Sequence, residues 1–167
     1  MNHDFYMKQA LEQAELALFD GEFPVGCVIV HKGNVVVRSR RTNSANQNMN
    51  EIDHAEIIAL KHLSGIVPPS ERKDVVLYST MEPCLMCFAA IMLSGIRHVV
   101  YSYEDAMGGG TACNPQTLPP LYSSAEMTMV KGIMRKESLD LFKRFFLLPH
   151  NRYWKGSYLE QYTLDSI

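Results

Sequence analysis

The sequence predicts an α/β domain in which helices cover a single β-sheet. Short apolar stretches of strand length alternate along the chain with longer helical patterns, which is typical of layered α/β folds. The 167 residues suit one domain with a full hydrophobic core. With 47% hydrophobic and 20% charged residues, the composition is that of an ordinary soluble globular protein.

The N-terminal part of the chain predicts a helix, a hairpin and a polar loop. Apolar residues spaced among polar ones favour a helix over residues 4–19. Strands are expected over 23–30 and 35–39, joined by a turn at 31–34. The loop spans residues 40–52 and contains Asn43, Asn46, Asn48 and Asn50.

The middle of the chain predicts two further strand and helix pairs. Helices are expected over residues 54–64 and 84–93, and Gly95 is a suitable stop for the second. Strands are expected over 75–79 and 98–101.

The C-terminal part of the chain contains a long irregular segment at 108–120, of a kind that often serves function. A short strand over 127–130 and a helix over 136–148 follow, and Pro149 ends the helix. We therefore expect one domain over residues 1–149 and, over 150–167, an aromatic tail that packs on it. The aromatic residues of the tail are Tyr153, Trp154, Tyr158 and Tyr162.

Composition and termini limit the location and partners of the protein. No apolar run approaches 18 residues, so no transmembrane helix is expected. The first residues lack the basic and then apolar layout of a signal peptide. Four cysteines fit a reducing cytoplasm better than a disulfide framework. A net charge of −2 gives no general attraction to nucleic acid.

Two short segments supply the side chains of one metal site. An H-x-E segment begins at His54 and ends at Glu56, and a P-C-x-x-C segment places Cys84 and Cys87 three residues apart. Zinc prefers nitrogen and sulfur ligands in a tetrahedron, and three protein ligands leave the open position of a catalytic site. We predict one Zn²⁺ per chain held by the histidine and the cysteines, with the glutamate moving protons.

Helix geometry supports this grouping. Cys84 and Cys87 share one helix face, and Pro83 suits the first turn of that helix. Asp53 is the expected N-cap of the helix that carries His54. We therefore expect the zinc between two helix N-termini, whose positive dipole ends favour thiolates.

Simpler interpretations of the C-x-x-C pair are a redox pair or half of a structural zinc site. A structural site needs a fourth ligand, and the remaining candidates show no metal-ligand spacing. These candidates are Cys27, Cys113, His62 and His98.

These motifs resemble those of the cytidine deaminase superfamily of zinc-dependent nucleobase deaminases, and within it the bacterial tRNA-specific adenosine deaminases. The resemblance also includes residues 22–26 (EFPVG) and Asn43, eleven residues before His54. It implies a three-layer α/β/α sandwich with a central five-stranded mixed sheet, a homodimer, and a hydrolase that releases ammonia from a nucleobase.

The resemblance also implies roles for individual residues. Asn43 is expected to orient the base, with an ordinary loop asparagine as the alternative. Phe23 and Val25 are candidate pocket walls or core residues, and Pro83 is a further candidate contact. Trp154 is a candidate lid, dimer contact or packing residue of the tail.

Three functional alternatives stay open. The substrate is a free base or nucleoside, such as cytosine or guanine, or it is adenosine in a tRNA anticodon loop. The tRNA enzymes end their last helix with arginines, where residues 147–150 here are Leu-Leu-Pro-His, and the tail around Trp154 is similar to that of fungal cytosine deaminases. A non-catalytic zinc-binding partner subunit is the third alternative, and the presence of Glu56 argues against it.

Overall fold

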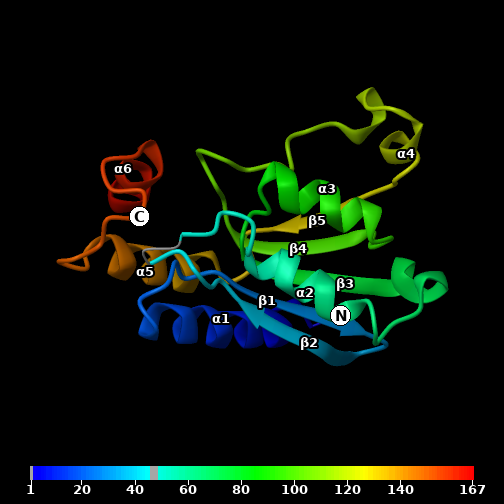
Figure 1. Ribbon diagram of the computed structural model, residues 1–167, viewed down its shortest axis with the longest axis horizontal. Coiled ribbons are helices and arrows are strands. Elements are labelled where there is room, and N and C mark those ends of the chain that lie inside the picture. Colours follow the sequence, from blue (N-terminus) through cyan, green and yellow to red (C-terminus); the bar gives the residue numbers. More distant parts are fainter. Residues whose placement is uncertain (1, 46–48) are drawn as a thin grey trace.

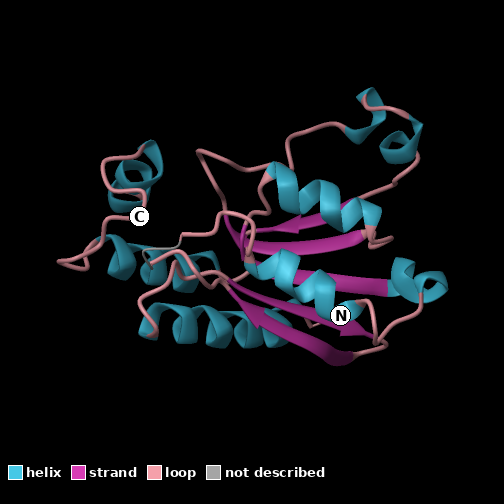
Figure 2. Ribbon diagram, in the orientation of Figure 1, coloured by secondary structure: helices cyan, strands magenta, loops and turns pink. Residues whose placement is uncertain are grey.

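A computed structural model describes residues 2–45 and 49–167, so Asn46 and Asn48 of the predicted loop lie outside the described residues. A five-stranded mixed sheet flanked by helices confirms the predicted fold (Figures 1 and 2). The strands are β1 (Gly26–His31), β2 (Asn34–Arg40), β3 (Val75–Met81), β4 (His98–Tyr103) and β5 (Thr128–Lys131). The α-helices are α1 (His3–Phe19), α2 (Ala55–Leu63), α3 (Leu85–Leu93), α4 (Pro120–Ser123), α5 (Arg135–Phe146) and α6 (Tyr158–Asp165).

The strands lie in the order β2-β1-β3-β4-β5. β1 is antiparallel to β2 and β3, while β4 is parallel to β3 and β5. β3 is buried along its whole length, as its apolar and β-branched sequence favours for a central strand. The β1–β2 turn has positive φ angles at Lys32 (50°) and Gly33 (79°), the backbone of a tight hairpin turn.

Helices form a layer on each side of the sheet (Figure 1). α1 packs against β1, β2 and β3 and against α5, while α2 packs against β1 and β2 and lies beside α3. α6 packs on α5. Among the described residues, no helix has both the length and the apolar character needed to cross a membrane.

The first strand begins later than predicted, at Gly26 instead of Phe23. Before this residue the Val25 amide donates to the carbonyl oxygen of Phe23 at 2.7 Å, a local bond in place of one within the sheet. At its first residue β1 crosses α1 very closely, since a Cβ atom on Gly26 would lie 2.1 Å from the carbonyl oxygen of Ala10. Residues 23–25 remain outside the sheet, and the Phe23 amide donates to Ser44 Oγ at 2.8 Å. This segment is thereby free to form a wall of the site.

Two C-terminal segments contain structure that was not predicted. The irregular segment after β4 contains a 3₁₀ turn (Pro115–Thr117) and the single-turn helix α4. The tail forms α6, whose N-cap Ser157 accepts from the Glu160 amide at 3.2 Å. The tail lacks a strong apolar periodicity, so its local sequence indicates a helix only weakly. Packing on α5 therefore stabilises this helix.

The functional residues lie near the carboxyl end of the central strand β3. β3 runs directly into the start of α3, and α3 connects it to the parallel strand β4. The carboxyl ends of parallel strands are the usual ligand sites of α/β sheets. The start of α2 lies beside the start of α3 because these two helices pack together.

Candidate metal centre and active site

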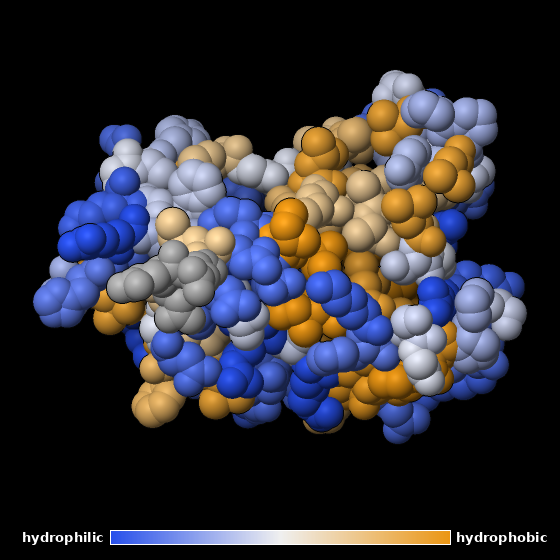
Figure 3. Space-filling model, in the orientation of Figure 1, coloured by the Kyte–Doolittle hydropathy of each residue, from blue (hydrophilic) through white to orange (hydrophobic). Residues whose placement is uncertain are grey.

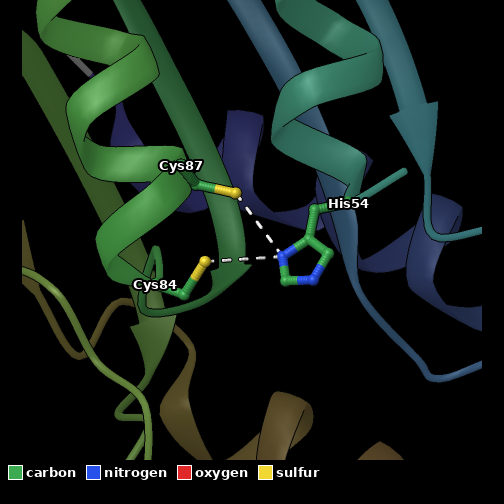
Figure 4. Close-up of side chains that lie close together, drawn as sticks. All are labelled: His54, Cys84 and Cys87. Atoms are coloured by element: carbon green, nitrogen blue, oxygen red, sulfur yellow. Dashed lines mark hydrogen bonds between the residues drawn. The ribbon is translucent and has the colours of Figure 1, made fainter. Parts of the chain in front are cut away.

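The start of each of these two helices contributes metal ligands. His54 is the N-cap residue of α2 and Cys84 is the N-cap residue of α3, and neither side chain makes a capping hydrogen bond. Cys87 lies in the first turn of α3. Figure 4 shows the three side chains pointing toward one another from the two helices. The predicted position between two helix N-termini is therefore correct.

The distances fit zinc. His54 Nδ1 lies 3.6 Å from Cys84 Sγ and 3.5 Å from Cys87 Sγ (Figure 4). A tetrahedral zinc with ordinary bonds to nitrogen and sulfur separates these ligand atoms by about 3.5–3.6 Å. All three ligand atoms lie within 4.8 Å of one another, and no other such group of His, Cys, Asp or Glu occurs in the described chain. The three residues are positioned to bind one zinc ion.

The electrostatics of Cys84 favour the thiolate that a metal requires. Hydrogen bonds from Cys87 and His54 lower the pKa of the Cys84 thiol to about 4. The start of α3 adds the positive end of the helix dipole.

Glu56 lies beside this group in the first turn of α2 and is 3% exposed. Ser79 Oγ donates to Glu56 Oε1 at 2.8 Å, and Glu56 Oε2 lies 3.6 Å from Cys87 Sγ. Burial raises the pKa of this carboxyl group above its ordinary value. A buried carboxylate of this kind, next to a metal position, is suited to accept and return a proton.

A cavity of about 260 Å³ opens onto these residues. This volume is just below the range of pockets for drug-sized ligands, so it suits a single base or a small nucleoside. His54, Glu56 and Cys84 line it. We call these three residues, together with the adjoining Cys87, the floor. Phe23 and Val25 line the cavity as walls.

The C-terminal tail also lines the cavity, and we call the segment from Tyr153 to Leu159 the cover. Tyr153 packs against Phe23 with ring centroids 5.2 Å apart and against Trp154 with centroids 5.7 Å apart. Trp154 is 43% exposed and lines the cavity together with Leu159.

Two predicted substrate contacts, Asn43 and Pro83, do not line the cavity. Asn43 has a φ of 60°, and its Nδ2 donates to Asp53 Oδ2 at 3.4 Å. The prediction of Asp53 as N-cap of α2 is wrong, because His54 occupies that position. The Asp53 carboxylate instead accepts from Asn50 Nδ2 at 2.7 Å, so it anchors the preceding loop.

The predicted place of Pro83 in the first helical turn is also wrong, because Pro83 precedes the N-cap. Its carbonyl oxygen accepts from the Gly110 amide at 2.9 Å. Residues 108–110 are three consecutive glycines, which we call the glycine loop. A Cβ atom on Gly110 would lie 2.6 Å from backbone atoms of Leu85, so this loop packs directly on the start of α3. This contact fixes the backbone that carries Cys84.

Sequence reasoning missed several residues of the site. The Glu82 carboxylate accepts from the amides of Asp105 and Thr111, both at 3.2 Å, and thereby holds the glycine loop. The position of Glu82 directly before the P-C-x-x-C segment could have identified it as a residue of the site. Asp105 is a turn residue that accepts from the Gly108 amide at 2.8 Å, and it also lines the cavity. No sequence signal marked Arg41, Glu51, Tyr153 or Leu159 as lining residues.

Comparisons with known proteins agree with this geometry. Residues 1–103 match the family model of the cytidine and deoxycytidylate deaminase zinc-binding region. The tRNA-specific adenosine deaminase of Rickettsia bellii is 34% identical over 140 residues, which cover 84% of this chain and 97% of that protein. The tRNA-specific adenosine deaminase of Streptococcus pyogenes serotype M18 is 30% identical over 142 residues, covering 85% and 88%.

Solved structures give the same picture. A structure from a study of tRNA:A34 deaminases acting at the wobble position of transfer RNA has a TM-score of 0.68 and 28% identity, covering 82% of this chain and 98% of that one. The guanine deaminase from Nitrosomonas europaea has a TM-score of 0.63 at 20% identity, covering 83% and 81%, and shows the fold alone. The match over residues 1–103, the fold and the zinc-ligand geometry together mean that the chain belongs to the cytidine and deoxycytidylate deaminase family of zinc-dependent hydrolytic deaminases.

Proposed function

We propose that this protein removes the ring amino group of a nucleobase, present as a free base or nucleoside, by hydrolysis with release of ammonia. The observation that supports it is the buried carboxylate of Glu56 beside the group of His54, Cys84 and Cys87, at the floor of a cavity the size of a base. The aromatic cover, which also lines this cavity, favours a small substrate.

The reaction replaces a carbon–nitrogen bond with a carbon–oxygen bond. When bound, zinc supplies Lewis acidity that lowers the pKa of a coordinated water from 15.7 to about 7. Ser79 holds Glu56 Oε1 at 2.8 Å, which leaves Oε2 to take the proton of the attacking water. Glu56 then delivers that proton to the neighbouring ring nitrogen. It takes the second proton from the hydroxyl that has been added to the ring carbon and gives it to the amine, so that the carbon–nitrogen bond breaks and ammonia leaves. Each such proton transfer contributes about 100- to 10,000-fold to the rate.

The proposed substrate contacts differ in their support. Phe23, Val25 and Trp154 line the cavity and are proposed to pack against the base. Asn43 and Pro83 remain proposed contacts on family resemblance alone, because neither lines it.

A second candidate substrate is adenosine in a tRNA anticodon loop. The 34% identity to a tRNA-specific adenosine deaminase favours it. Ammonia release from the zinc-loaded protein decides between the candidates, measured on cytosine, guanine, adenine, their nucleosides and an anticodon stem-loop. Release from free bases or nucleosides supports the first candidate, and release from the stem-loop alone supports the second. Silence on every substrate, with one zinc per chain, supports a non-catalytic partner subunit.

We also propose that the protein is a homodimer. An apolar patch covers α2, α3 and α4 in the space-filling view (Figure 3). Leu85 and Leu93 of α3 and Leu121 of α4 are 59%, 56% and 69% exposed. Light scattering of the protein and of Leu93→Glu tests this, and a monomeric wild type would contradict it.

All four cysteines are free, which fits the cytoplasmic location that we propose.

A further inference from the structure

Arg41 has donors that the fold leaves unused. It follows β2 and is only 2% exposed, yet its Nε and Nη1 atoms are buried without a hydrogen-bond partner among the described residues. Its Nη2 makes one long contact, 3.4 Å to Glu51 Oε2. A guanidinium stays charged in proteins, and leaving its buried donors unpaired is costly. A ligand that accepts these hydrogen bonds would explain why the arginine is there.

The arginine that carries these donors belongs to the proposed active site. Arg41 lines the same cavity as His54, Glu56 and Cys84. Its backbone amide donates to the carbonyl oxygen of Val25 at 2.8 Å, which ties it to the cavity wall.

Two neighbouring groups, Glu51 and Tyr153, help to hold the guanidinium in place. Tyr153 Oη donates to Glu51 Oε2 at 2.9 Å, the same oxygen that Arg41 contacts. Glu51 is 53% exposed, so solvent weakens its pull on the arginine. The arginine is therefore positioned without having all its donors satisfied.

The charges around the cavity select the kind of acceptor. Arg41 is the one arginine or lysine among the described lining residues, whereas Glu51, Glu56, Glu82 and Asp105 bring four carboxyl groups. A phosphate would face these acidic groups with a single cation to offset them. A neutral carbonyl oxygen accepts the same hydrogen bonds without that repulsion.

We propose that Arg41 recognises a ring carbonyl oxygen of the substrate, so that the enzyme selects oxo bases of the cytosine or guanine type over adenine. This deepens the proposed function and rests on it. In cytosine and in guanine, one ring nitrogen separates the amino-bearing carbon from a carbonyl carbon, while adenine has no carbonyl. Arginine pairs well with guanine O6 and N7, and at adenine an amino donor occupies the place of that oxygen.

The test compares substrates that differ by this oxygen and by the hydrogen that the adjoining ring nitrogen carries with it. Guanine is paired with 2-aminopurine and cytosine with 4-aminopyrimidine, and kcat/KM is measured for wild type and Arg41→Met. We expect wild type to prefer at least one oxo base over its partner by about 100-fold. Arg41→Met should lose most of that preference, because kcat/KM should fall for the oxo base alone. Arg41→Lys, which keeps the charge and a donor, should lie between them.

Arg40→Met is the matched control, because Arg40 is the adjacent arginine and pairs with Asp20 on the surface at 3.0 Å. It should leave the preference unchanged. The proposal would be overturned if Arg41→Met lowered kcat/KM equally for both members of a pair. Efficient turnover of adenine by wild type would overturn it as well. A loss confined to nucleoside monophosphates would show that Arg41 reads a phosphate instead.

Calorimetric binding of the same base pairs separates this proposal from the proposed reaction. If no substrate is turned over but wild type still binds the oxo base more tightly than its partner, and Arg41→Met does not, carbonyl recognition stands and the reaction fails. If ammonia is released but neither binding nor kcat/KM depends on the oxygen, the reaction stands and the role of Arg41 fails. Absence of both binding and turnover overturns both.

Discussion

The floor and the cover of the cavity are built in different ways. The floor takes His54 and Glu56 from one segment and Cys84 and Cys87 from another, each within a single helical turn. The cover comes from a tail that begins at Tyr153, 99 residues after His54 and 66 after Cys87, and packs on α5 through α6. The difference suggests that the floor determines the chemistry and the cover determines which substrate is retained. The following predictions test that division, from the largest expected effect to the smallest.

Loss of a floor ligand should have the largest effect. In Cys84→Ser the soft thiolate is replaced by a hydroxyl, which is a poor zinc ligand. We expect zinc affinity to fall by more than about 100-fold, beyond what loss of an outer-shell partner costs, and turnover to disappear with it. Metal content after dialysis measures this, with Cys113→Ser as the control because Cys113 lies outside the ligand group. Full zinc content in Cys84→Ser would contradict the ligand assignment.

Loss of the proton carrier should separate chemistry from metal binding. Glu56→Gln keeps the shape of the side chain but cannot accept the proton. We expect kcat to fall by about 100- to 10,000-fold while one zinc per chain is retained. Turnover and metal content are measured on the same sample, and turnover within threefold of wild type would refute the role of Glu56.

A small change in the glycine loop should disturb the floor from outside. Gly110→Ala places a methyl group 2.6 Å from the backbone of Leu85, so either the loop or the start of α3 must move. We expect destabilisation of about 1–3 kcal/mol and weaker zinc binding. Chemical denaturation measures the change in stability. Gly65→Ala is the control, because nothing lies within 4 Å of its Cβ position. Equal stability of the two variants would show that the loop does not support the floor.

Removal of the cover should change substrate affinity and spare the metal. Trp154→Ala removes an aromatic surface of the cavity, and stacking of a base on such a surface is worth about 1–3 kcal/mol. We expect kcat/KM to fall by about 10-fold or more with unchanged zinc content. Tyr158→Ala is the control, because Tyr158 is 61% exposed and does not line the cavity. A drop in zinc content in Trp154→Ala would break the division between floor and cover.

The smallest effect is expected at the contact that attaches α6. Burial opposes the ionisation of Glu104, but hydrogen bonds from Arg135 and Tyr162 overcome it and lower the pKa of this carboxyl group. A lowered pKa in the folded state means that the stabilisation is present above pH 4.5 and is lost as the pH falls through the folded value. Both partners are about one third exposed, so we expect a contribution of about 1 kcal/mol or less.

Thermal unfolding of wild type and Glu104→Gln measures this contribution across the acid range. The difference between the two should be largest near neutral pH and should vanish in acid. A constant difference at every pH would show that the ionised carboxylate contributes nothing.

The sequence predicted the floor well and the surrounding contacts poorly. The zinc ligands lie close to one another in two short motifs, and helix spacing is enough to place Cys84 and Cys87 together. The errors at Asp53 and Pro83 are errors of one and two residues at helix ends, where the capping residues turned out to be His54 and Cys84. Because a ligand residue can itself occupy the N-cap position, the usual capping preferences misled the prediction.

The cover was harder to anticipate, because its residues gain their roles from contacts over long sequence distances. Tyr153 reaches Glu51 across 102 positions, and Tyr103 Oη meets Thr163 Oγ1 at 3.0 Å across 60. Trp154 was named as a candidate lid from the resemblance of the tail to that of fungal cytosine deaminases, and it does line the cavity.

By itself the sequence determined the fold class, the zinc ligands and the neighbouring carboxylate, because hydrophobic periodicity and motif spacing are local properties of the chain. Only the tertiary structure decided which side chains surround the substrate. The burial of Arg41 with unpaired donors depends on how β2, the following loop and the tail meet. A charged residue at the end of a strand is ordinarily solvated, and nothing local distinguishes this one until packing removes the water around it.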